Sequence, residues 1–190
     1  HEYMHLEAFI MTAQTLNFTL FDCYRKLTEI NFIKKKKLLE INSTVFAKEF
    51  SSHFFFDNET LQLETVTKPF EIDSSPISLG KLMKFAEFGG YENKSLWSVC
   101  GWNWLLNNKN KTFISRSSKT KDGIVFLKKW KKKKHLVNNH FPAIHVSYYE
   151  AEAFCFWANR RLPTESEWMA ASKNSGFYWG NVWEWTNNIF

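Results

Sequence analysis

The sequence predicts an α+β fold with much irregular structure, held together by buried aromatic side chains and preceded by a helical segment. Two observations carry this prediction: helical and strand-like hydrophobic patterns follow one another along the chain, and 18% of the 190 residues are aromatic, with 19 Phe, 9 Trp and 6 Tyr. Such a content of large apolar side chains supports a sizeable core. Alternating βαβ units, internal repeats and a glycine-rich phosphate loop are not found.

The net charge of +6 comes from two lysine-rich runs, at 34–37 and 128–134. These runs hold ten lysines, and the other 15 basic residues are outnumbered by 19 acidic ones. The runs are therefore expected to be solvated loops on a mildly acidic protein, and a nucleic-acid partner is not expected. No apolar stretch is long enough to span a membrane.

The three cysteines, Cys23, Cys100 and Cys155, are widely spaced and odd in number. This pattern favours neither a disulfide framework nor a structural zinc site. A reducing compartment fits best, and the expected location is cytoplasmic.

Residues 1–30 are expected to be helical, as one long helix or two short ones of the kind found in a bundle. Their apolar residues recur at three- and four-residue steps: Leu6, Phe9, Ile10, Ala13, Leu16 and Leu20. One or two helices cannot bury such a stripe alone, so the helix is expected to be poorly anchored, with its bundle partners upstream. The chain begins at His1, not Met, and is interpreted as a fragment that lacks its original N-terminus.

The later elements are predicted in chain order. A lysine- and phenylalanine-rich connector covers 31–60, and 61–67 alternates with period two, as a half-buried strand does. Residues 76–88 form a short helix that Gly89-Gly90 ends. A polar loop is expected over 107–123. Ser147 and Glu150 form a capping box that starts a helix running to Ala158, and the remainder, 160–190, is loop-rich with four tryptophans. Residues 61–190 are expected to form one folded domain.

The sharpest chemical signal is the segment His1-Glu2-Tyr3-Met4-His5. Histidines at i and i+4 lie on one helix face, where both imidazoles can reach one metal ion. In one interpretation this is a zinc-protease motif with Glu2 as general base. In another, the histidines are two of the three ligands of an iron site with open positions for substrate and oxygen. A coincidental pair is the third alternative.

Three blocks in the second half of the chain resemble the signature of the formylglycine-generating-enzyme (sulfatase-modifying-factor) domain family, whose fold is C-type-lectin-like. They are Ser147 to Trp157, Arg161-Leu-Pro-Thr-Glu-Ser-Glu-Trp168, and Gly180-Asn-Val-Trp-Glu-Trp-Thr186. Gly89-Gly90-Tyr91, Leu96-Trp97 and Gly101-Trp102-Asn103-Trp104 resemble one branch of the family, the ergothioneine-type sulfoxide synthases, in which a DinB-like four-helix bundle precedes this domain.

The resemblance implies an oxidoreductase that uses Fe(2+) and O2 to join a thiol to a histidine-derived imidazole such as hercynine. His1 and His5 then correspond to two iron ligands, the third being a histidine expected upstream. Tyr3 and Met4 lie beside them and are assigned to the substrate pocket. The resemblance disfavours the zinc-protease interpretation, because no glycine-containing segment with a third ligand follows the pair.

Three departures from the family pattern lead to the interpretation of this chain as a truncated copy whose own activity is in doubt. The third iron ligand of the family is expected upstream of His1, the first residue of the sequence. Trp179-Gly180-Asn181 joins two motifs that relatives separate by a few tens of residues, so the aromatic core is expected to be strained or incompletely covered there. The chain also stops at Phe190, before the part that helps to bind the sulfur substrate in relatives.

The other motif residues have structural and functional interpretations. Cys155 is predicted to be buried, and Cys23 and Cys100 have no partner in sequence, so formylglycine-generating activity is not expected. Asn181 and Glu184 are assigned to a calcium ion, Ca(2+), as in some relatives. Trp183 either belongs to the core with Trp185 or faces a trimethylammonium substrate. The internal scaffold is expected to include Arg161, Glu165, Glu167 and Trp168. The alternative function is a non-catalytic lectin-like module that has lost its metal site. The sequence does not indicate an oligomeric state.

Overall fold

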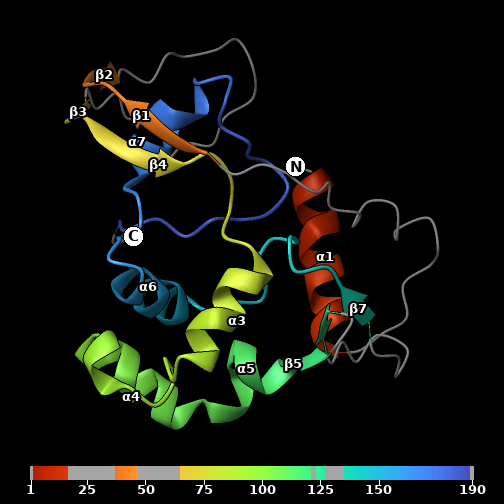
Figure 1. The fold of residues 1–190 in the computed structure, drawn as a ribbon. Helices are drawn as coiled ribbons and strands as arrows, with labels where there is room; N and C mark the ends of the chain where they lie inside the picture. The colour runs from red at the N-terminus through yellow and green to blue at the C-terminus, as the bar shows by residue number, and fades with distance from the viewer. Residues whose placement is uncertain (1, 17–36, 47–64, 121–122, 127–134, 189–190) are drawn as a thin grey trace. The chain divides into compact units, whose positions relative to one another are not determined.

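The structure, a computed structural model, describes residues 2–16, 37–46, 65–120, 123–126 and 135–188 (Figure 1). The chain divides into two compact units, each with its own hydrophobic core. Unit 1 contains residues 1–32 and 77–159, and unit 2 contains residues 33–76 and 160–190. The predicted division into 1–30, 31–60 and 61–190 stays a prediction. Among the described residues, no helix is long and apolar enough to cross a membrane.

Unit 1 combines helices with one small antiparallel sheet, so the predicted mixture of helix and strand is confirmed. The sheet has the order β5-β6-β7, with Ser118 opposite Val125 and Val125 opposite Leu136. The described elements of unit 1 are α1 (Glu2–Leu16), α3 (Leu79–Glu87), η3 (Lys94–Leu96), α4 (Val99–Asn107), η4 (Lys109–Lys111), α5 (Phe113–Arg116), β5 (Ser117–Thr120), β6 (Gly123–Phe126), β7 (His135–Val137) and α6 (Tyr148–Trp157).

Helix α6 begins as the sequence predicts. The Ser147 hydroxyl oxygen accepts a hydrogen bond from the Glu150 amide at 3.3 Å, and the Glu150 carboxylate accepts one from the Ser147 amide at 2.9 Å. Two orphan amides at the helix start are therefore satisfied reciprocally, which confirms the predicted capping box. Ser78 and Ser98 cap α3 and α4 through their side chains in the same way.

The Glu150 side chain is fully buried and links three parts of unit 1. Its Oε1 accepts hydrogen bonds from the Tyr91 hydroxyl at 2.7 Å and from the Phe113 amide at 2.6 Å. Its Oε2 accepts from the backbone and hydroxyl of Ser147, both at 2.9 Å. Burial, and then the charge of Glu150, raise the pKa of Tyr91 above its usual range, so Tyr91 remains a donor.

The predicted end of α3 at Gly89-Gly90 is confirmed, and close packing explains the second glycine. A Cβ on Gly90 would lie 2.2 Å from the Phe85 ring, which is itself fully buried. The Gly90 carbonyl also accepts a hydrogen bond from the Trp97 indole at 2.8 Å. Gly89 has a φ of 83°, in the left-handed region that glycine adopts at little cost.

The polar loop predicted over 107–123 is wrong for its described residues. They contain η4, α5 and β5, and Phe113 is fully buried in the core of unit 1. The many polar residues serve as caps instead: the Thr112 hydroxyl accepts a hydrogen bond from the Ser115 amide at 3.3 Å and starts α5. Tertiary contacts, above all the bond from Phe113 to Glu150, stabilise this segment against its loop-like composition.

In the described part of unit 2, one helix packs against two short antiparallel strand pairs. Strand β1 (Leu38–Ile41) pairs with β4 (Phe70–Asp73), and β2 (Thr44–Phe46) pairs with β3 (Thr65–Thr67). The strand predicted over 61–67 is confirmed at Thr65–Thr67, and its first four residues lie outside the described residues. Alternate residues of β1 and β4 form the core with helix α7 (Glu165–Ser172): Leu39, Ile41, Phe70 and Ile72 pack with Ala170, Ala171, Trp168 and Phe177.

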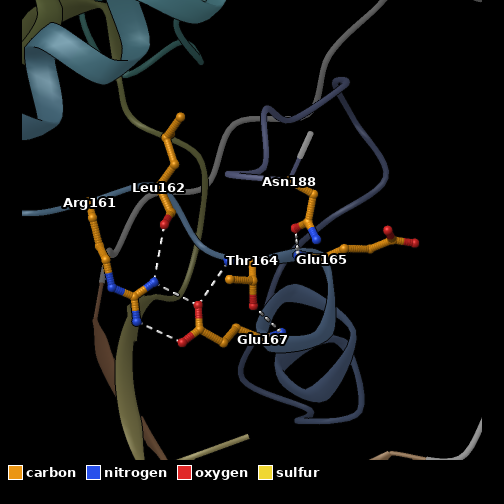
Figure 2. Close-up of polar contacts among 6 residues, drawn as sticks. All are labelled: Arg161, Leu162, Thr164, Glu165, Glu167 and Asn188. Carbon is orange, nitrogen blue, oxygen red and sulfur yellow. Dashed lines mark hydrogen bonds and ion pairs between the residues drawn. The ribbon is translucent and has the colours of Figure 1, made fainter. Parts of the chain in front are cut away.

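The described residues of 160–190 are loop-rich, as predicted, and helix α7 is the element that the prediction did not include. Thr164 and Glu167 form a capping box, the pattern that identified the start of α6. Arg161 donates to both carboxylate oxygens of Glu167, at 2.7 and 2.6 Å, and this confirms the predicted scaffold pair (Figure 2). Figure 2 also shows that Asn188 accepts a hydrogen bond from the Glu165 amide at 2.7 Å.

The first prediction concerns Glu150. Glu150→Ala would leave the Tyr91 hydroxyl and the Phe113 amide buried without an acceptor, and each such group costs about 1–3 kcal/mol. The expected result is a loss of unfolding free energy of several kcal/mol, or failure to fold, measured by urea denaturation. Glu92→Gln, at an exposed position nearby, is the control and should change stability little. If Glu150→Ala unfolds at the same urea concentration as the wild type, the carboxylate does not stabilise the fold as proposed.

The second prediction concerns Gly90. In Gly90→Ala the added methyl group overlaps the Phe85 ring, and overpacking in a core costs about 1–3 kcal/mol or more. We expect a lower melting temperature and weaker near-ultraviolet circular dichroism from the aromatic core. Gly90→Ala combined with Phe85→Leu should recover part of the loss, because the smaller side chain makes room. Two independent, additive losses would show that the two residues are not in contact.

The third prediction concerns pH. The hydrogen bonds from Arg161 hold the pKa of Glu167 below its ordinary value of 4.5, so this pair stabilises the folded state above that value. The contribution disappears as the pH falls through the lowered pKa. Arg161→Met should therefore make stability less dependent on pH below about pH 5, as measured by urea midpoints across an acidic series. Arg160→Met, at the exposed neighbouring position, should retain the wild-type slope.

Candidate functional site

Helix α1 carries the predicted metal-binding motif. It begins at Glu2, so His5 lies on a regular helix, as the pairing with a histidine four residues earlier requires. His1 lies outside the described residues, and the pair stays a prediction. Tyr3 and Met4 expose 85% and 49% of their surface beside His5, a position in which a substrate can contact them. Among the described residues, no group of three or more His, Cys, Asp or Glu side chains could hold a metal ion.

The apolar stripe of α1 is partly exposed, and the poor anchoring of this helix stays a prediction. Ala13 is buried, whereas Phe9 and Leu16 expose 61% and 56% of their surface. The remainder of the predicted helical region, from residue 17, lies outside the described residues. The described residues of the motif, Glu2 to His5, are themselves exposed.

A second group of motif residues lies in the C-terminal part of unit 2, which we call the C-terminal segment (residues 178–188). Backbone hydrogen bonds of 2.8 Å hold both of its ends against the rest of unit 2. The Tyr178 amide donates to the Ser74 carbonyl, and the Asn187 amide donates to the Pro163 carbonyl. Between these ends, Gly180 has a φ of 89°, and a Cβ there would meet no atom within 4 Å. The short Trp179–Asn181 join therefore passes through an open left-handed turn.

The expectation that Trp183 and Trp185 belong to the core is wrong. They expose 83% and 51% of their surface, and they alternate in burial with Glu184, whose Oε1 has no contact with solvent. In this segment the Glu184 carboxyl group points inward, and the indoles of Trp183 and Trp185 on either side of it face outward. Trp183 is thus placed where a ligand could contact it.

Glu184 is electrostatically unusual. Burial raises its pKa to about 7, and the nearby Trp168 indole N–H opposes this shift by stabilising the charged form. Neither Glu184 Oε1 nor Trp168 Nε1 makes a hydrogen bond of ordinary geometry with the described residues. A carboxyl group that titrates near neutral pH can give or take a proton, which makes Glu184 a candidate for acid–base chemistry.

Two cysteines can be placed. Cys155 is partly buried and packs against the core of unit 1, consistent with its predicted structural role, and Cys100 is exposed on α4. Both are free thiols. Cys23 lies outside the described residues. Since a helix residue packed on a core cannot readily approach a second thiol, Cys155 has no apparent catalytic role.

Sequence reasoning found Glu184 but missed the burial that raises its pKa. No local signal shows this burial, because it depends on the residues that the fold brings around the carboxyl group. It also missed the capping role of Thr164, although the Thr-x-x-Glu pattern was present to find it.

Comparison with known proteins matches residues 43–179, well over half of the chain, to the family described as the sulfatase-modifying factor enzyme 1-like domain. Inactive C-alpha-formylglycine-generating enzyme 2 of Mus musculus is 27% identical over 152 residues, which are 70% of this chain and 45% of that protein. Hercynine oxygenase of Mycobacterium tuberculosis is 30% identical over 115 residues, which are 60% of this chain and 26% of that protein.

A shorter match with higher identity is to formylglycine-generating enzyme of Mus musculus, 48% identical over 48 residues, which covers 23% of this chain and 13% of that protein. The chain thus spans less than half of the length of each of these relatives. The family match covers strands β2, β3 and β4 and helix α7 of unit 2, together with residues 77–159 of unit 1. The chain belongs to the family of sulfatase-modifying factor enzyme 1-like domains.

Proposed function

We propose that the chain is part of a non-haem iron, O2-dependent sulfoxide synthase of the ergothioneine type. Such an enzyme joins a thiol, cysteine or γ-glutamylcysteine, to a histidine-derived imidazole such as hercynine. The observation that carries the proposal is the 30% identity to a hercynine oxygenase in a chain whose first described helix bears His5 of the HExxH motif. The partners are then small molecules and O2, and the free thiols of Cys100 and Cys155 suit a reducing, cytoplasmic location.

The residues of α1 fit an iron centre in the chemistry of their side chains. Imidazoles are good ligands for Fe(2+), and two at i and i+4 on one helix bind from the same side. His1 and His5 would hold the ion, together with a third ligand that the described residues do not supply. When bound, the iron supplies O2 activation for carbon–sulfur bond formation. Tyr3 and Met4 would line the substrate pocket, and α1 would be the end of a DinB-like bundle.

A second candidate is a non-catalytic module that keeps the family fold without a working metal site. The likeness to inactive C-alpha-formylglycine-generating enzyme 2, which extends over 70% of this chain, favours it. The two candidates differ in one measurable property, because only the first needs His5 to bind a metal. Formylglycine-generating activity gains no support from the thiols, since Cys155 packs on the core.

The fourth prediction separates these two candidate functions. The purified chain is titrated with Fe(2+) under anaerobic conditions, and binding is measured by calorimetry. If α1 forms an iron site, His5→Ala should weaken binding at least about tenfold, because one of two imidazole ligands is lost. The control is His140→Ala, an exposed histidine of unit 1 outside the motif, which should bind as the wild type does. Equal binding by wild type and His5→Ala would reject the iron site. No binding by either would favour the non-catalytic module.

A further inference from the structure

Helix α1 carries two methionines at different distances from His5. Met4 directly precedes His5, and it follows His1 by three residues, the spacing of neighbours on a helix surface. Met11 lies six residues beyond His5, which corresponds to a rise of about 9 Å along the helix axis. A metal ion held at His5 would therefore lie beside Met4 and more than one helical turn from Met11.

The two methionines of α1 are almost equally accessible from solvent. Met4 exposes 49% of its surface and Met11 exposes 57%, whereas Met83 on α3 exposes 7% and belongs to the core of unit 1. The oxidation of a thioether follows its exposure. Exposure alone therefore predicts that Met11 is oxidised at least as fast as Met4 and that Met83 is protected. A preference for Met4 would need a cause other than exposure.

The relevant reaction is the oxidation of a thioether to a sulfoxide by hydrogen peroxide. The sulfur–oxygen bond forms as the oxygen–oxygen bond of the peroxide breaks. The sulfur loses two electrons, and the second peroxide oxygen leaves as water. Fe(2+) with open coordination positions draws small oxidants to itself and is regenerated, so it accelerates the oxidation of neighbouring groups without changing this balance.

We propose that Met4 is a site of iron-directed sulfoxidation, at which peroxide oxidises the thioether beside His5 in preference to the similarly exposed thioether of Met11. This inference rests on the proposed function, because it needs an iron ion at His5. The modification replaces an apolar thioether by a polar sulfoxide on the surface that would line the substrate pocket, and sulfoxide reductases can reverse it.

The proposal is tested on the full chain, which is loaded with an equimolar amount of Fe(2+) under anaerobic conditions and treated with limiting hydrogen peroxide. Mass spectrometry of the peptides then measures the sulfoxide at each methionine. With iron, Met4 should be oxidised several times as fast as Met11. With a chelator in place of iron, Met11 should be oxidised at least as fast as Met4, as their exposure predicts. Met83 should stay reduced in every sample in which unit 1 is folded.

The preference for Met4 should disappear in His5→Ala, because the ion is no longer held next to it. The matched control is His140→Ala, an exposed histidine outside the motif, which should keep the wild-type ratio of the two sulfoxides. Equal oxidation of Met4 and Met11 in the iron-loaded wild type, or a preference that persists in His5→Ala, would overturn the proposal. Calorimetry on the same samples then shows whether the iron site falls with it: Fe(2+) binding that depends on His5 would leave the proposed function standing, and no binding would reject both.

Discussion

The buried carboxylate of Glu150 is the interaction on which unit 1 depends. A carboxylate taken out of water loses a large solvation energy, and it is tolerated in a core only when its oxygens are hydrogen-bonded. Here Oε1 is shared by a tyrosine hydroxyl and a backbone amide, and Oε2 completes the start of α6. Since the three partners come from distant parts of the sequence, the carboxylate fixes where the turn after α3, helix α5 and helix α6 meet.

The aromatic core of unit 1 is arranged around this polar centre. Tyr91 reaches Glu150 with its hydroxyl and packs its ring against Phe85, with ring centroids 5.5 Å apart, and against Trp97, at 5.8 Å. Gly90 supplies both the space for Phe85 and the acceptor for the Trp97 indole. Tilted and edge-on contacts of this kind have directional preferences, so the rings and the hydrogen bonds reinforce one geometry.

The sequence predicted best where a structure is determined by neighbouring residues. The capping box at Ser147, the stop at Gly89-Gly90 and the helix that contains His5 all follow from local rules. Prediction from the sequence failed where contacts between distant residues determine the local structure. Residues 107–120 have a loop-like composition but fold around Phe113, and Trp183 is exposed although a tryptophan in a family motif suggests a core position. Local pattern reading has no access to either fact, because burial depends on what the rest of the chain brings to that point.

The residues that define the fold are separate from those that are proposed to bear chemistry in this chain. Capping boxes, the Glu150 network and the Arg161–Glu167 pair are internal contacts that need no ligand. His5 and Trp183, by contrast, are exposed and contribute little to either core. Such a division allows a family to keep one scaffold while its members gain or lose a metal site, because the substitutions that remove the chemistry carry little cost in stability. Relatives named as an oxygenase and as an inactive enzyme are both compatible with this scaffold, and the test of Fe(2+) binding by this chain separates the two proposed functions.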